Sequence, residues 1–328
     1  MPNAPIACIG NAIVDVIAPT TDDFLTANEL AKGGMMLIDT DQAEALYAKM
    51  APGKESSGGS GANTAAGIAA LGSGVRYIGR VADDQLGKVF QHDLRAAGAL
   101  YDVPMASPDV PTARCLILVT PDGERTMNTY LGTSVDLGEA DVDFEAVAAA
   151  KILYLEGYLW DSESARPAME RARDVLREAG GRVAFTLSDG FCVDRHRAGF
   201  RELAGGGVDI LFANEDELKS LYETDDFDAA VAAQRGKVQI AAITRGDQGA
   251  VVLFGDDTIS VPAEPVAKVV DTTGAGDLFA AGFLAGLEQR RDLKDCARLG
   301  AVAAAEVISH YGARPETDLK TLAAKALG

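Results

Sequence analysis

Four consecutive residues, Gly274-Ala275-Gly276-Asp277, combine an almost bare backbone with one carboxylate. They lie within residues 269–287, VVDTTGAGDLFAAGFLAGL, which begin like a strand end and continue like a helix. Glycines allow a tight turn and let a ligand approach the main chain. The first N–H groups of a helix lack intrahelical acceptors and lie at its positive end, so this turn could hold a phosphate or a developing anion. Asp277 could then take a proton from a substrate hydroxyl.

This turn also has an interpretation without chemistry. An acidic residue in a first helical turn stabilises the helix by itself, and Gly and Thr are ordinary residues between a strand and a helix. The motif alone leaves both interpretations open, so the elements around it must decide.

Strands and helices alternate along most of the chain. The expected strands are 5–16 (interrupted at Gly10-Asn11), 75–81, 152–155, 183–187, 210–213, 240–244 and 250–254. The expected helices are 41–50, 62–71, 84–97, 164–178, 215–223, 227–233, 276–289 and 292–309. This alternation predicts a three-layer α/β/α fold, with a mainly parallel central sheet and helices on both of its faces.

A hairpin interrupts the alternation. Residues 115–120 and 124–130 are extended runs joined by Pro121-Asp122-Gly123, a good turn sequence. The hairpin predicts a small accessory sheet. Residues 20–38 are expected to be irregular, and residues 54–61, KESSGGSG, to form a loop.

Five candidate positions fall at or just after an expected strand, or in a loop that leads into a helix. They are Asp15, the Gly58-Gly59 loop, Asn214, Thr244 and the Gly274 turn. Asp15 closes an apolar segment, where an acidic group is costly unless it is solvated or paired. It either accepts hydrogen bonds from ligand hydroxyls or caps a turn. The shared position favours one ligand site at the carboxyl ends of the strands.

Composition excludes several classes of function. The 328 residues are 48% hydrophobic and 24% charged, as in soluble globular proteins, and the formal charge of −19 repels nucleic acid and anionic lipid. The four cysteines form no Cys-x-x-Cys pair, which indicates reduced thiols in a cytoplasmic protein. We expect no membrane span and no export signal. The Walker and Gly-x-Gly-x-x-Gly nucleotide-binding motifs are both missing.

The motifs resemble, in order and along about the whole chain, those of the ribokinase-like (PfkB) carbohydrate and nucleoside kinases. Residues 271–277, DTTGAGD, look like that family's C-terminal signature, and residues 58–63, GGSGAN, are similar to its N-terminal one. Segment 79–87, the Asn214-x-x-Glu217 pattern and loop 244–249 also fit. The resemblance implies one ribokinase-like domain over residues 1–328, with a lid sheet from residues of about 15–40 and 100–133.

The resemblance also implies transfer of the γ-phosphoryl group of ATP to a primary alcohol. Asp277 would be the base, and the amides of Ala275, Gly276 and Asp277, which follow Gly274, would bind the developing charge. The acceptor would be held by Asp15, Gly58, Gly59 and Asn63. Closing the lid would exclude water.

On the nucleotide side, the resemblance implies that Asn214 and Glu217 act through Mg²⁺ and its waters. Thr244, Gly246 and Gly249 would line the nucleotide. Family members often need a monovalent cation such as K⁺, and Asp271 and Thr273 would lie near it.

The acceptor is expected to be adenosine or another purine nucleoside. A helix at 41–50 separates the first lid strands from the Gly-Gly loop, and this arrangement looks like adenosine kinases rather than sugar kinases such as ribokinase. Residues 124–128, ERTMN, and 310–315, HYGARP, loosely fit the same branch. A sugar kinase for ribose or fructose is the alternative, and a non-catalytic nucleoside- or sugar-binding regulator is a third. Arg125 is expected to be a solvated hairpin residue rather than a phosphate-side or lid contact, and the protein a monomer or homodimer.

Overall fold

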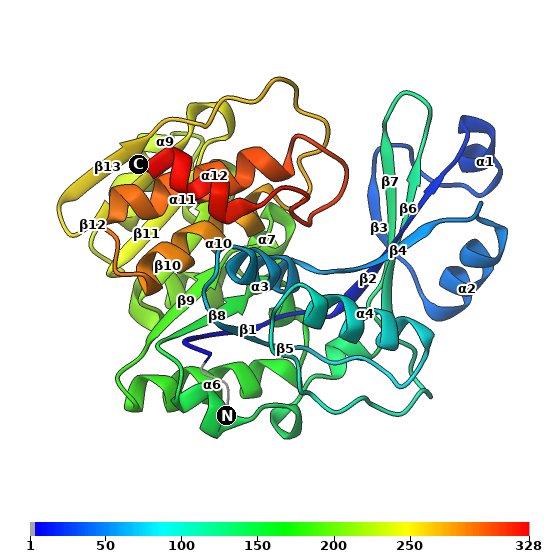
Figure 1. Ribbon diagram of the computed structural model, residues 1–328, viewed down its shortest axis with the longest axis horizontal. Helices are drawn as coiled ribbons and strands as arrows, with labels where there is room; N and C mark the ends of the chain where they lie inside the picture. Colours follow the sequence, from blue (N-terminus) through cyan, green and yellow to red (C-terminus); the bar gives the residue numbers. More distant parts are fainter. Residues whose placement is uncertain (1–3, 328) are drawn as a thin grey trace.

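The larger of two β-sheets forms the centre of the computed structural model, which describes residues 4–327 (Figure 1). It has eight strands in the order β13-β12-β11-β10-β9-β8-β1-β5. Their bounds are β1 (Ile6–Ile9), β5 (Val75–Ile78), β8 (Ile152–Glu156), β9 (Arg182–Thr186), β10 (Ile210–Asn214), β11 (Ile240–Thr244), β12 (Ala250–Phe254) and β13 (Asp257–Val261). All neighbours are parallel except the pairs β11–β12 and β12–β13, so the predicted mainly parallel sheet is confirmed.

Helices cover both faces of this sheet, which confirms the three-layer fold. The face covered by α10 lies opposite the face covered by α6 (Figure 1). The helices of the first face are α3 (Ser60–Ala70), α10 (Ala275–Glu288), α11 (Leu293–Val307) and α12 (Leu319–Leu327). The remaining helices are α5 (Phe144–Ala148), α6 (Ala165–Glu178), α7 (Gly190–Glu202), α8 (Glu215–Tyr222), α9 (Phe227–Gln234) and α4 (Gln85–Ala96), the last of which lies beside α3 (Figure 1). Every residue of β1 and β8 is buried, as expected for strands covered on both faces.

The smaller sheet stands to one side of the larger one (Figure 1). It has five strands in the order β3-β7-β6-β2-β4. Their bounds are β2 (Ile13–Pro19), β3 (Met35–Leu37), β4 (Lys54–Gly58), β6 (Ala113–Val119) and β7 (Arg125–Tyr130). Two short helices, α1 (Asp22–Ala27) and α2 (Thr40–Lys49), accompany it. The predicted hairpin is confirmed, since β6 and β7 are antiparallel.

Three local predictions are wrong. Residues 54–58 are a strand rather than a loop, because they pair antiparallel with β2 although their sequence, KESSG, has low strand propensity. Residues 20–38 contain α1 and β3. The apolar segment 5–16 divides into β1 and β2, which belong to different sheets, and β2 continues to Pro19. Asp15 therefore lies within a strand and does not cap a turn.

Within residues 4–327, no helix has the length and apolar character needed to cross a membrane.

Close packing of α10 on α11 depends on Gly282. A Cβ at this position would lie 2.5 Å from the carbonyl carbon and oxygen of Leu299. We expect Gly282→Ala to push the helices apart and lower the free energy of unfolding by roughly 1–3 kcal/mol, seen as a lower Tm. Gly190→Ala is the control, because its Cβ would meet nothing within 4 Å. Equal Tm values for the two variants would contradict this packing.

Candidate active site

Asp277 lies where the first turns of α3 and α10 meet. Its Oδ1 accepts a hydrogen bond from Ser60 Oγ at 2.6 Å, and its Oδ2 accepts one from Asn63 Nδ2 at 2.9 Å. Burial raises the pKa of Asp277, and the bonds from Ser60 and Asn63 and the charge of Arg314 oppose this effect. The two signature motifs, separated by 214 residues between Asn63 and Asp277, therefore form one site.

The turn that carries Asp277, here called the aspartate turn (residues 271–277), needs glycine for two reasons. Gly274 has φ +80°, and a Cβ there would lie 2.7 Å from Ala313 Cβ. A Cβ on Gly276 would meet nothing within 4 Å, so there is open space in front of this residue. Glycine thus permits both the backbone conformation and close access.

Two of the three expected anion-binding amides are open. Ala275 N–H donates to Thr272 O at 3.2 Å, so the expectation that it is free is wrong. It closes the turn that starts α10. The N–H groups of Gly276 and Asp277 have no acceptor in the described part of the chain, and both lie in the first turn of α10. These two amides lie at the positive end of the helix dipole.

Asp15 faces the glycine loop, here defined as residues 57–63. A Cβ on Gly58 would lie 2.3 Å from Asp15 Oδ2, and one on Gly59, where φ is +89°, would lie 2.2 Å from Asn11 O. Only glycines fit between this loop and β2. Burial raises the pKa of Asp15 to about 6, against the opposing charges of Arg314 and Arg125. The charge of Asp277 adds to the rise. The glycine loop joins the two carboxylates, because Gly58 lies against Asp15 while Ser60 and Asn63 bond Asp277.

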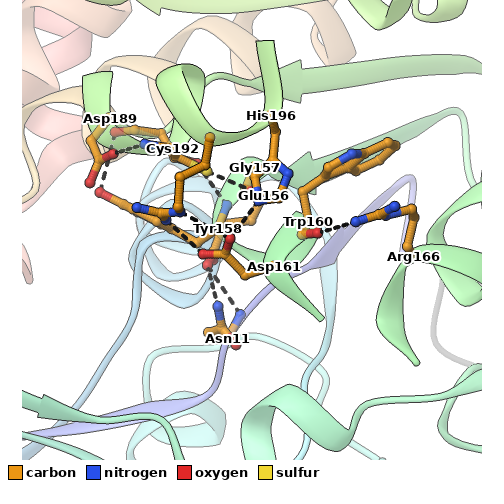
Figure 2. Close-up of polar contacts among 12 residues, drawn as sticks. Asn11, Glu156, Gly157, Tyr158, Trp160, Asp161, Arg166, Asp189, Cys192 and His196 are labelled. Atoms are coloured by element: carbon orange, nitrogen blue, oxygen red, sulfur yellow. Dashed lines mark hydrogen bonds and ion pairs between the residues drawn. The ribbon is translucent and has the colours of Figure 1, made fainter. Parts of the chain in front are cut away.

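Glu156, at the end of β8, was missed by the sequence analysis (Figure 2). It is 1% exposed, and it accepts hydrogen bonds from Gly61 N at 2.6 Å, Asn11 N at 3.3 Å and Asn11 Nδ2 at 3.2 Å. Burial raises its pKa to about 7. Glu156 therefore joins the β1–β2 connection to the start of α3. An acid that closes the apolar run 152–155 is the same signal that identified Asp15.

Arg125 is not a solvated residue, and that expectation is wrong. Its Nη1 lies 2.6 Å from Asp271 Oδ2, and the side chains of Arg125 and Asp271 are 10% and 5% exposed. Arg125 Nη1 also donates to Thr273 Oγ1 at 3.2 Å. Arg125 therefore fastens β7 of the smaller sheet to the aspartate turn.

The Asp271 carboxylate is saturated with donors. Oδ1 accepts from Thr273 N at 3.1 Å and Thr273 Oγ1 at 2.7 Å, and Oδ2 accepts from Arg125 and from Gly312 N at 3.0 Å. A carboxylate has about four acceptor positions. A K⁺ ion at Asp271 would therefore have to displace one of these donors.

The expected nucleotide-side residues gather at the ends of β10 and β11. Asn214 and Thr244 are direct neighbours in the parallel register, and Asp277 lies close enough to raise the pKa of Glu217. That pKa is about 7, chiefly because Glu217 is buried. Gly246 and Gly249 follow with φ of +56° and +83°.

Asn214 and Glu217 also cap α8. Both carboxylate oxygens of Glu217 accept hydrogen bonds from Asn214, at 2.9 Å from the backbone N and 2.6 Å from Nδ2. This geometry suits contact with Mg²⁺ through water better than direct ligation. Over residues 4–327, no three His, Cys, Asp or Glu side chains converge closely enough to hold a metal ion by themselves.

A two-sheet α/β fold with a carboxylate beside open helix amides is the arrangement of a phosphotransferase that acts on an alcohol group. The sequence pattern of the pfkB family carbohydrate kinases matches residues 4–320, and the chain belongs to this family.

Similar proteins have different acceptors in their names. An adenosine kinase from Sinorhizobium meliloti is 49% identical, with a TM-score of 0.92 and 99% of each chain covered. A probable sugar kinase from Rhizobium etli CFN 42 has the same identity, TM-score and coverage. A fructokinase from Klebsiella pneumoniae is 33% identical over 247 residues, 70% of this chain and 76% of that protein. The family is therefore established, and these names leave a sugar or a nucleoside as the acceptor.

Glu156→Gln tests whether Glu156 holds the glycine loop. The amide that replaces one carboxylate oxygen can face the Asn11 donors or Gly61 N–H, but in either case a donor meets a donor. We expect a loss of roughly 1–3 kcal/mol in the free energy of unfolding, measured by denaturant titration, and a higher KM for the acceptor.

The control is Glu55→Gln, since Glu55 accepts a hydrogen bond from Tyr47 Oη at the surface. It should leave both quantities nearly unchanged. If Glu156→Gln matched this control, the glycine loop would not depend on Glu156.

Proposed function

We propose that this protein is an ATP-dependent kinase that phosphorylates the 5′-hydroxyl of adenosine or another purine nucleoside. Asp277 accepts the proton of the hydroxyl, and the amides of Gly276 and Asp277 stabilise the charge that develops on the transferred phosphoryl group. Asp15 and Asn63 hold the ribose hydroxyls, together with the backbone at Gly58 and Gly59. The meeting of Asp277, Ser60 and Asn63 supports this arrangement.

The observation that favours a nucleoside is an apolar row on the face of the smaller sheet that carries Asp15. Side chains directly opposite in register share a face, as do residues two apart on a strand. Ile17 pairs with Ile117, Ile117 with Met127, and Met127 with Met35. Ile17 is two residues from Asp15, so this row borders the site. Ile117 is already buried, but Met35 is 50% exposed and Ile17 and Met127 are half-buried. A purine base would cover this remaining apolar surface, whereas a free sugar would leave it in water.

The 49% identical adenosine kinase from Sinorhizobium meliloti supports the same choice. The second candidate acceptor is a free sugar such as ribose or fructose, which the fructokinase from Klebsiella pneumoniae and the probable sugar kinase from Rhizobium etli CFN 42 favour. A non-catalytic regulator is disfavoured, because the base and the glycines of the aspartate turn are in place.

In this proposal the chain is one catalytic domain, and the smaller sheet acts as a lid that excludes water during transfer. Thr244, Gly246 and Gly249 line the nucleotide, and Asn214 and Glu217 approach Mg²⁺ through its waters. Mg²⁺ bound to the phosphates would neutralise part of their charge. K⁺ is not included, because the Asp271 carboxylate already has four donors. We place the enzyme in the cytoplasm, where reduced cysteines are common.

The first test compares ATP consumption with adenosine, other nucleosides, ribose and fructose. We expect turnover with adenosine and little with free sugars. Asp277→Asn should lower kcat by roughly 10²–10⁴-fold and leave adenosine binding nearly intact, because it removes the base and keeps the shape. Turnover with a free sugar alone would exclude a nucleoside as the acceptor. A near-normal kcat in Asp277→Asn would exclude Asp277 as the catalytic base.

The apolar row has its own test. Met127→Ser should raise the KM for adenosine by roughly tenfold and leave the KM for ATP unchanged, because one apolar contact with the base is lost. Met36→Ser is the matched control, since Met36 pairs with Asn128 on the opposite face of the same strands. Equal KM values for adenosine in both variants would mean that the purine ring does not lie on the apolar row.

A further inference from the structure

Arg314 joins two parts of the site that are distant in the sequence. It lies in the loop between α11 and α12 and extends to the glycine loop. Its Nε donates to Ser57 O at 3.1 Å and its Nη2 to Ser57 Oγ at 3.0 Å, while Nη1 donates to Ala62 O. One guanidinium therefore bonds both ends of the loop that contains Gly58, Gly59 and Gly61.

The loop that carries Arg314 is held from both sides. Glu306 Oε1 accepts hydrogen bonds from Glu316 N at 2.9 Å and Thr317 N at 2.8 Å, which fixes its second half. Asp271 accepts from Gly312 N at 3.0 Å, and Ala313 packs against Gly274, where an added Cβ would lie 2.7 Å from Ala313 Cβ. The base of the Arg314 side chain is thus fixed to the aspartate turn.

The charge of Arg314 has no close carboxylate among these bonds, since all three acceptors are neutral oxygens. It acts instead on the two site carboxylates, and lowers the pKa of both Asp15 and Asp277. Burial lowers the pKa of Arg314 itself to about 10, so the group stays charged at neutral pH. A positive charge placed in this way favours the ionised form of a base.

We propose that Arg314 is a positioning residue for phosphoryl transfer. It sets the distance between the glycine loop and the aspartate turn, and it supplies a fixed positive charge beside Asp15 and Asp277. This role rests on the proposed function for its kinetic consequences, but not for its effect on the glycine loop. Holding the glycine loop needs a planar fork that spans Ser57 and Ala62, whereas favouring the ionised carboxylates needs only a positive charge.

Two variants separate these parts. In Arg314→Gln both the fork and the charge are lost. We expect the acceptor KM to rise roughly tenfold to a hundredfold with the ATP KM nearly unchanged. The acid limb of the pH profile of kcat/KM, where activity falls as the base is protonated, should move to higher pH. Burial raises the pKa of Asp277, and in this variant the positive charge that opposes the rise is lost. Arg314→Lys should raise the acceptor KM but keep the acid limb near that of the wild type.

Other charged groups near Asp277 and Asp15 also affect the pH at which the acid limb falls. Glu156 and Glu217 each feel the charge of Asp277, and Arg125 and Asp271 act on Asp15. These groups are the same in wild type and variants, so the difference between the pH profiles reports Arg314.

Hydrogen exchange in the ligand-free protein tests the role of Arg314 in the glycine loop without measuring catalysis. Amides of residues 57–63 should exchange roughly tenfold faster in Arg314→Gln, because their loop loses three hydrogen bonds. The matched control is Arg166→Gln: Arg166 Nη2 also donates to a backbone carbonyl, that of Trp160 at 2.8 Å (Figure 2), but on α6. It should leave exchange at 57–63, the acceptor KM and the acid limb unchanged.

The proposal is overturned if Arg314→Gln exchanges like the wild type at residues 57–63. It is also overturned if Arg314→Gln keeps the KM for the acceptor and the acid limb of the wild type, whether or not its Tm falls. An acid limb that moves equally in Arg314→Lys and Arg314→Gln would exclude the role of charge. Failure of the proposed function looks different: the wild type would turn over none of the acceptors, while the exchange result would still decide the role of Arg314 in the loop.

Discussion

The hydrogen bonds from Ser60 and Asn63 to Asp277 are the contact on which the rest of the site depends. They require the first turns of α3 and α10 to meet, and small residues make this approach possible. A Cβ on Gly67 of α3 would lie 2.6 Å from Leu278 Cδ1 and 2.7 Å from Ala281 Cβ of α10. Both helices are preceded by a glycine, Gly59 before α3 and Gly274 before α10. The Asp277 carboxylate therefore lies between the glycine loop and the open amides of Gly276 and Asp277.

Several buried acids surround this contact, and each has a structural task. Glu156 holds Gly61 and Asn11, Glu217 holds Asn214, and Asp271 holds Arg125. Burial of these carboxylates costs free energy, which the converging N–H donors offset. In a chain whose formal charge is −19, the guanidinium groups of Arg125 and Arg314 offset part of the negative charge of Asp271, Asp15 and Asp277.

Much of the fold could be predicted from the sequence, because apolar runs buried on both faces are visible as continuous segments, as in 152–155 and 240–244. The candidate residues at strand ends, such as Asn214 and Thr244, do lie side by side. α1 was missed although its cap is local, since Thr21 accepts a hydrogen bond from Phe24 N. Other failures depended on partners far away in the chain. Residues 54–58 become a strand only because β2 pairs with them, and Arg125 is buried only because Asp271 is opposite it. No local pattern specifies either event.

The roles of individual groups were harder to predict than the motifs. The helix after the aspartate turn is confirmed, but the expected strand end before it is wrong, since residues 262–273 form no strand. The use of the Ala275 amide by Thr272 O depends on turn geometry. Arg314 was noticed only as part of a loosely fitting segment, since its partners are two backbone carbonyls and one hydroxyl of residues 57–62, more than 250 residues away in the sequence.

The most direct test of the central claim is a crystal structure of the protein with adenosine and a non-hydrolysable ATP analogue. We expect the 5′-oxygen of adenosine to lie about 2.6–3.2 Å from the Asp277 carboxylate, with the γ-phosphate in front of the amides of Gly276 and Asp277. A 5′-oxygen pointing away from Asp277, or a γ-phosphate bound elsewhere, would contradict it.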